Sequence, residues 1–247
     1  LSHVGARIAV RAALNHVRND RATVADALAD GSGDRARALY VAMLGAISGE
    51  LRGAVADHVA PLQDFATTLS VFVAKPTGIA AMQIGGGIIV SRRLSGDYSL
   101  LFSEGAGATE PESGYVTDRD PAERMRVGIQ DGPVSFLCAA SAPLDRLSAR
   151  RRDGAAQKDF FRPLDRYAST APDDVEVHRG IRTFLRSDRV HGRLDQDVAL
   201  ALCVALQRKT DRPAHVALDE AQAKRQVDVR AHQQDEHRRS PHDARDP

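Results

Sequence analysis

Residues 65–93 constrain the fold more than any other part of this sequence. Three β-prone runs follow one another there, separated by Pro and Gly, at residues 68–74, 79–84 and 87–91. Short runs of this kind predict an antiparallel meander. The runs are apolar on both faces, so we expect a sheet that is covered on both sides.

The glycine triplet Gly85, Gly86 and Gly87 separates the second run from the third. Glycine adopts positive φ and allows close approach of another backbone or of a ligand. The triplet is therefore either a tight structural turn or part of a ligand site, and the sequence leaves both interpretations open.

Composition narrows the function classes. The 247 residues are 43% hydrophobic, enough for one domain plus extensions. The net charge of +1, the aromatic content of 4% and the absence of Trp argue against nucleic acid and anionic membranes as partners. No apolar run reaches the length of a membrane span, and no signal-peptide pattern begins the chain. Cys138 and Cys203 are predicted to be reduced core thiols, which is typical of a cytoplasmic protein.

Helical patterns flank the β-rich region. We expect helices over residues 4–17, 24–29, 36–59, 144–150, 158–168 and 175–186, with Thr23 capping the second. Further strands are expected at residues 98–103 and 115–117, a hairpin over residues 124–140, and a fully buried strand at residues 198–206. The fold class is therefore α+β. We expect one domain over residues 1–207 and a polar, disordered tail over residues 208–247.

Several segments together resemble a known family. FATTLSVFVA, IAAMQIGGGIIVSRR, VSFLCAASAPLDRL, KDFFRPLDRY and FLRSDRVHGRLDQDVALAL occur in the order and spacing found in metal-dependent type 2C (PPM-type) protein serine/threonine phosphatases of the bacterial branch. The opening HVGARIAVRAAL is similar to the first long helix of that family. The resemblance runs from Val4 to Leu206. It implies two packed antiparallel sheets flanked by helices, an α-β-β-α sandwich.

The resemblance also implies a reaction. Family members hold a pair of Mn or Mg ions on aspartates, and a metal-bound hydroxide attacks phosphoserine or phosphothreonine in phosphoprotein substrates. Hard divalent ions require several anionic oxygens, and paired metals lower the pKa of water.

The ligand positions implied by the family are substituted in this chain. One aspartate position falls on Gly86, a second on Ala142 and a third on Gln196, which Asp195 and Asp197 flank. A fourth, on the first strand pair, would lie upstream of the first residue. We therefore expect a fragment that lacks that strand pair, with no cofactor assigned, and Mn or Mg only if a metal is retained.

The remaining candidate side chains each have two interpretations. Asp195 and Asp197 would share one face of an extended segment, where they either hold one weakly bound cation or accept backbone amides. Glu104, Glu110 and Glu112 lie either near the sheet end or on a solvated loop. His191 is either a general acid or a surface histidine before a turn.

Three functions remain open. The first is a type 2C phosphatase-like domain that is catalytically impaired or inactive and acts by binding a phosphoprotein or signalling partner. The second is an active phosphatase that uses Asp195, Asp197 and upstream residues. The third is a partial reading frame without a selected function. We expect the chain to be monomeric.

Overall fold

The computed structural model describes residues 1–27, 32–94, 96–102, 114–144, 156–191, 194 and 198–204. They fall in one compact unit, Leu1–Ala205. The predicted disordered tail, residues 208–247, lies outside the described residues, so the proposed division of the chain into a domain and a tail stays a prediction.

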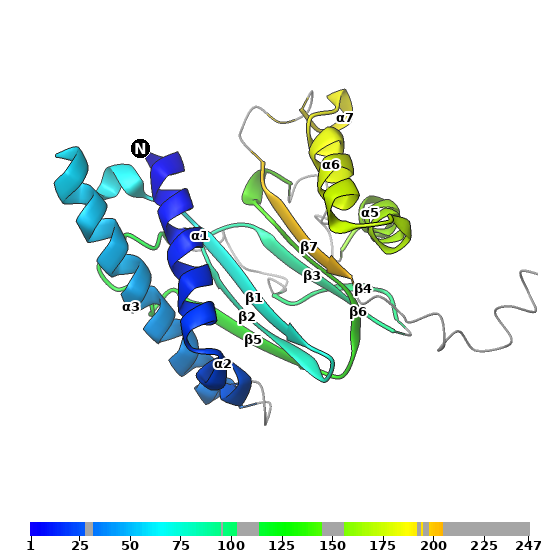
Figure 1. Cartoon of the computed structure of the whole chain (residues 1–247), viewed down its shortest axis with the longest axis horizontal. Coiled ribbons are helices and arrows are strands. Elements are labelled where there is room, and N and C mark those ends of the chain that lie inside the picture. Colours follow the sequence, from blue (N-terminus) through cyan, green and yellow to red (C-terminus); the bar gives the residue numbers. More distant parts are fainter. Residues whose placement is uncertain are drawn as a thin grey trace, which may run out of the picture. The chain divides into compact units, whose positions relative to one another are not determined.

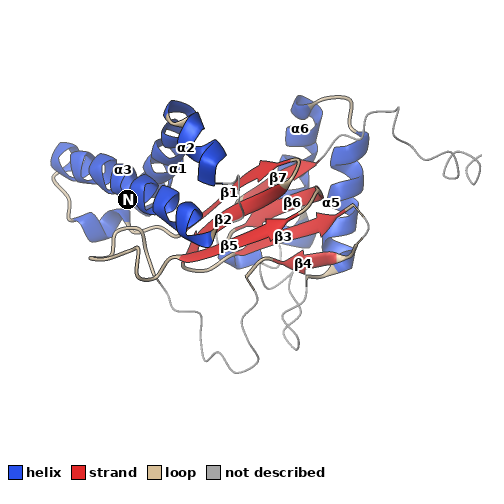
Figure 2. Ribbon diagram, turned by 90° about the horizontal axis from the view of Figure 1, so that it is seen from below, coloured by secondary structure: helices blue, strands red, loops and turns tan. Residues whose placement is uncertain are grey.

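Among the described residues, seven strands form two antiparallel sheets (Figures 1 and 2). Sheet A has three strands in the order β1 (Leu69–Lys75), β2 (Gly78–Ile84) and β5 (Arg126–Asp131). Sheet B has four strands in the order β4 (Tyr98–Leu100), β3 (Ile88–Arg93), β6 (Val134–Ala140) and β7 (Leu200–Val204). All pairings within both sheets are antiparallel.

The sheets pack face to face, and helices cover their outer faces (Figure 1). The layer between the sheets contains Ile79 and Ala81 of β2 against Ile89, Leu137 and Ala139 of sheet B. Outside sheet A lie α1 (Ser2–Asn19), α2 (Arg21–Ala27) and α3 (Gly33–His58), followed by the 3-10 helix η1 (Leu62–Phe65). Outside sheet B lie α5 (Lys158–Thr170), α6 (Asp174–Leu185) and the short α7 (Asp188–His191). This confirms the α+β class and the α-β-β-α sandwich.

Local capping explains several helix starts. The Ser32 side chain caps α3, and the Asp173 carboxylate caps α6 by accepting a hydrogen bond from the Glu176 amide at 2.8 Å. The expectation that Thr23 caps α2 was wrong. Asp20 Oδ1 accepts from the Thr23 amide at 3.2 Å, because α2 begins three residues earlier than its apolar pattern indicated.

The 26-residue helix α3 is long and apolar enough, by length and composition alone, to span a membrane. In the structure one of its faces is buried against α1 and sheet A, through residues such as Tyr40, Met43 and Ile47. A helix at the core of a domain passes the same composition test, and we interpret α3 in that way.

Two strand connections differ from the expected topology. The predicted meander continues through β1 and β2, but β3 belongs to sheet B, and the predicted hairpin is likewise divided between β5 in sheet A and β6 in sheet B. Gly and Pro signals mark where a strand ends, and they are the same whether the chain folds back or crosses to a facing sheet. The strand expected at residues 115–117 is also wrong, because this segment forms turns.

The last strand, β7, is not fully buried as its continuous apolar character had indicated. Its residues alternate between half-buried and exposed, and Cys203 is exposed. Cys203 pairs with Leu137, so both side chains point towards sheet A. Leu137 packs between the sheets with Ile79 and Ala81 of β2, whereas Cys203 is not part of that cluster. The prediction of a core thiol is therefore correct for Cys138 and wrong for Cys203.

This difference predicts selective thiol chemistry. In the native protein, Cys203 should react with a disulfide reagent such as DTNB, whereas Cys138 should react only after unfolding. Cys138 is 0% exposed, and burial raises the pKa of its thiol to about 12, so almost no nucleophilic thiolate is present at neutral pH. Counting reactive thiols before and after denaturation tests this expectation. The Cys203→Ser variant is the control and should show no fast reaction; a native Cys138 that reacts as quickly as Cys203 would contradict the packing of β6 and β7.

Candidate functional site

The two positions that the family resemblance predicts as ligand positions meet at one end of the sandwich. Gly86 lies in the connection that carries the chain from β2 to β3, and Ala142 lies two residues after the end of β6. Because β3 pairs with β6 in the register Ile88 to Ala140, the two positions face each other. A Cβ atom placed on Gly86 would lie 2.9 Å from the Cβ of Ala142. Two such carbon atoms do not approach this closely, so this arrangement requires glycine at position 86 as long as position 142 carries a side chain.

The other two glycines of the triplet are required by the turn itself. Gly85 and Gly87 have φ values of 75° and 120°, which side-chain-bearing residues rarely adopt. A Cβ on Gly85 would lie 2.4 Å from the Thr68 methyl group, and one on Gly87 would lie 2.7 Å from the Ala140 carbonyl oxygen. Of the two interpretations of the triplet, the structure supports the tight structural turn, since protein atoms already occupy the space beside all three glycines.

Ser141 ties the end of β6 to the segment that leads into β7. Its amide donates to the Ala199 carbonyl at 3.0 Å, and its hydroxyl accepts from the Ala199 amide at 2.9 Å. The candidates Asp195, Gln196 and Asp197 lie outside the described residues, as do Glu104, Glu110 and Glu112. His191 ends α7, but its side chain is not described. The roles proposed for these residues stay predictions.

The polar groups beside the triplet were missed by sequence reasoning. Gln83, 1% exposed, donates from Nε2 to the Ser70 hydroxyl at 3.3 Å and accepts at Oε1 from Arg126 Nη2 at 2.6 Å. Its Nε2 lies 3.3 Å from where a Cβ of Gly87 would be. The one available signal was a glutamine within an otherwise apolar run. The cluster presents an amide, a hydroxyl and a guanidinium, and none of these supplies an anionic ligand to a metal.

The described residues do not suit a pair of divalent ions. No group of three or more His, Cys, Asp or Glu side chains that could hold a metal occurs among them. Hard divalent ions bind several anionic oxygens. Gly86 and Ala142 provide no side-chain oxygen, and the neighbouring Arg126 carries a positive charge.

This architecture is similar to that of known proteins. A model of the protein phosphatase 2C family matches residues 1–186. The chain belongs to the protein phosphatase 2C family. A comparison with curated proteins found no match.

The fold of this phosphatase 2C chain is shared by a solved structure. The catalytic domain of the serine/threonine protein phosphatase PstP, in complex with two manganese ions, is similar with a TM-score of 0.53 and 15% identity, over 83% of this chain and 82% of that domain. A bacterial serine phosphatase carrying a point mutation has a TM-score of 0.47 and 10% identity, over 72% of this chain and 73% of its own. At such identities the likeness to PstP shows the fold and no more.

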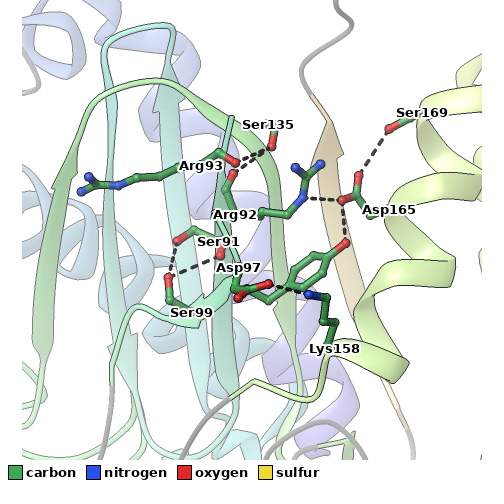
Figure 3. Close-up of polar contacts among 10 residues, drawn as sticks. Ser91, Arg92, Arg93, Asp97, Ser99, Ser135, Lys158, Asp165 and Ser169 are labelled. Atoms are coloured by element: carbon green, nitrogen blue, oxygen red, sulfur yellow. Dashed lines mark hydrogen bonds and ion pairs between the residues drawn. The ribbon is translucent and has the colours of Figure 1, made fainter. Parts of the chain in front are cut away.

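A second polar centre lies on the outer face of sheet B (Figure 3). Asp165 of α5 is 5% exposed and accepts hydrogen bonds from Arg92 Nε at 2.8 Å and from the Tyr98 hydroxyl at 2.7 Å. Ser169 donates to its other oxygen at 3.3 Å. Burial, reinforced by the bond to Asp165, raises the pKa of Tyr98 to about 12, so the tyrosine remains a proton donor at physiological pH. Burial alone lowers the pKa of Arg92, but the bond to Asp165 and its charge raise it overall.

The fit between Gly86 and Ala142 can be tested by a double-mutant cycle. Gly86→Ala should lower the free energy of unfolding by about 1–3 kcal/mol, because the added methyl group overlaps Ala142. Combining it with Ala142→Gly should recover most of that loss, so the two changes should be strongly coupled. Urea unfolding of the single and double variants measures the coupling.

The control for this cycle is Gly45→Ala on α3, where nothing lies within 4 Å of the added Cβ. It should stabilise the protein by about 0.5–1 kcal/mol through helix propensity. Additive effects of the Gly86 and Ala142 changes would contradict the close approach of the two loops.

The buried carboxylate predicts a different stability effect. Asp165→Ala should cost about 3 kcal/mol in free energy of unfolding, because it leaves the partly buried Arg92 and the Tyr98 hydroxyl without their acceptor. Asp97→Ala, which removes an exposed ion pair with Lys158, should change stability little. Thermal or urea unfolding compares the two; equal effects would show that Asp165 does not organise this part of the fold.

Proposed function

We propose that this protein phosphatase 2C chain is catalytically impaired and acts by binding a phosphoprotein or signalling partner. The observation that carries the proposal is the close approach of Gly86 and Ala142, whose Cβ positions would be 2.9 Å apart. The family's ligand positions are thus brought together, but as two positions without ligand atoms.

The surroundings support the same conclusion. Two-metal hydrolysis uses the ions to generate a hydroxide nucleophile and to screen the phosphoryl oxygens. Here the nearest buried polar group, Gln83, is neutral and is held by the cation Arg126. Such a set of groups favours an anion over a divalent cation at this sheet end.

The scaffold is intact where the described residues show it. The clusters on both sides of each sheet contain fully buried large side chains, including Tyr40, Phe65, Phe136 and Phe161. A packed sandwich whose described residues form no group of metal ligands is better suited to recognition than to hydrolysis. Phosphoproteins are the partner class that membership of this family suggests.

A calorimetric titration of the purified chain with manganese tests the proposal. We expect no saturable binding in the micromolar range, and no hydrolysis of an aryl phosphate when manganese is present. The PstP catalytic domain, whose structure holds two manganese ions, is the positive control.

Two tight manganese sites would overturn the proposal and favour an active phosphatase. In that case the Asp195→Asn and Asp197→Asn variants should lose metal binding, since those carboxylates flank Gln196, the residue predicted at the third ligand position, and are the remaining metal candidates. A folded chain that shows no manganese binding in the titration supports the proposal that the phosphatase is catalytically impaired.

A further inference from the structure

A cavity of about 340 Å³ lies between the end of β3, the start of β4 and one face of α5. Its charged lining consists of the cations Arg92, Lys158, Arg162 and Arg166 and the carboxylates Asp97 and Asp165. Two positive charges therefore remain uncompensated, in a chain whose net charge is only +1. The cavity is smaller and more cationic than the two cavities lined by α5 and α6 and by α1 and α3.

The cations come from two elements. Lys158, Arg162 and Arg166 recur at four-residue intervals and therefore share one face of α5. Arg92 reaches the same space from β3 (Figure 3). Positive charge is thus presented from a strand and from a helix, on two walls of one cavity.

The hydrogen bonds fix Arg92 and leave part of it available. Asp165 binds its Nε atom, and the Tyr98 ring lies 5.7 Å from its guanidinium carbon. No described residue hydrogen-bonds the two terminal nitrogens of Arg92. A guanidinium held through Nε is pre-oriented and loses little freedom when a ligand binds to its outer edge.

The other cations are accessible. Lys158 pairs with Asp97 at 2.7 Å, but the two side chains are 51% and 81% exposed, so this pair is easily exchanged for another anion. Arg162 lies 3.6 Å from Asp159, whose side chain is 97% exposed. The Arg166 side chain makes no ion pair with any described residue.

We propose that this cavity binds the dianion of a phosphate monoester. Arginine forks bind phosphate through paired, charge-assisted hydrogen bonds, and lysine adds a mobile charge. The volume accommodates a phosphate group with a few atoms of its carrier. The same chemistry fits a phosphorylated side chain and a free phosphate compound.

The cavity is separate from the family's metal positions. Arg92 lies four residues along β3 from Ile88, about 13 Å at the rise of an extended strand. Strand alternation directs Ile88, Val90 and Arg92 to the helix-covered face of sheet B, with Ile88 and Val90 in its core cluster. The site therefore needs neither a metal nor the sheet end, and it extends the proposed binding function by naming the group that is bound.

The test is a titration of the full chain followed by NMR of its backbone amides, with EDTA present throughout so that metal plays no part. The probes are inorganic phosphate, a phosphoserine peptide and the same peptide without phosphate. We expect shift changes at residues of α5 and of the β3–β4 region with both phosphate probes and none with the unphosphorylated peptide.

Matched variants decide whether the cavity is responsible. The double variant Arg162→Gln with Arg166→Gln removes two exposed charges and leaves the buried Asp165 network intact. It should weaken phosphate binding at least about fivefold. Arg182→Gln removes an exposed arginine of α6 that does not line the cavity, and it should leave the affinity unchanged. Affinity should also fall as ionic strength rises.

The outcomes separate cleanly. If phosphate and the phosphopeptide bind with similar affinity, a free phosphate anion is sufficient for binding. If the phosphopeptide binds more tightly, the ligand is a phosphorylated side chain. Both results support the site. Absence of phosphate binding, or an equal loss in the α5 and α6 variants, overturns it. Because EDTA removes metal, the phosphate-binding result does not depend on whether the manganese titration supports a catalytically impaired phosphatase.

Discussion

The packing of sheet A on sheet B is the constraint on which the remainder of the structure depends. The layer between them includes Ala81 and Ala139, whose small side chains allow the sheets to lie close together. In strand order the chain changes sheet three times, from β2 to β3, from β4 to β5 and from β5 to β6. Sheet packing therefore fixes how near the crossing segments come to the strand ends beside them.

The β2–β3 crossing places three glycines against the end of β6, and each of them faces protein atoms at close range. The family resemblance predicts metal-ligand positions at the same place. The structure shows close packing there, with Gln83 and Arg126 as the adjacent polar groups. A cluster of charged side chains lies instead on the outer face of sheet B, around Asp165.

Much of the architecture could be predicted because its signals are local. Amphipathic periodicity identified α1, α3, α5 and α6 to within a few residues, and β-branched runs identified β1, β2, β3 and β6. Family resemblance indicated which residues occupy the ligand positions. It could not show that Gly86 and Ala142 are in near contact, since this depends on the register between β3 and β6.

The wrong predictions of topology and exposure share one cause, because all of them concern contacts between segments that are far apart in the sequence. Whether β2 continues into a hairpin or crosses to another sheet depends on which face of β3 finds a partner. The exposure of Cys203 depends on the place of β7 at the end of the strand order in sheet B. The pair Arg92 and Asp165 is separated by 73 residues, and nothing in the neighbourhood of either residue indicates the other.

The contact between Gly86 and Ala142 also constrains how this chain can vary. A Cβ at position 86 would lie 2.9 Å from the Cβ of Ala142, so any larger residue at position 86 collides with the side chain at position 142. A substitution at position 86 therefore needs a smaller residue at position 142 or a shift of the backbone. Two positions that are 56 residues apart in the sequence are thus expected to change as a pair.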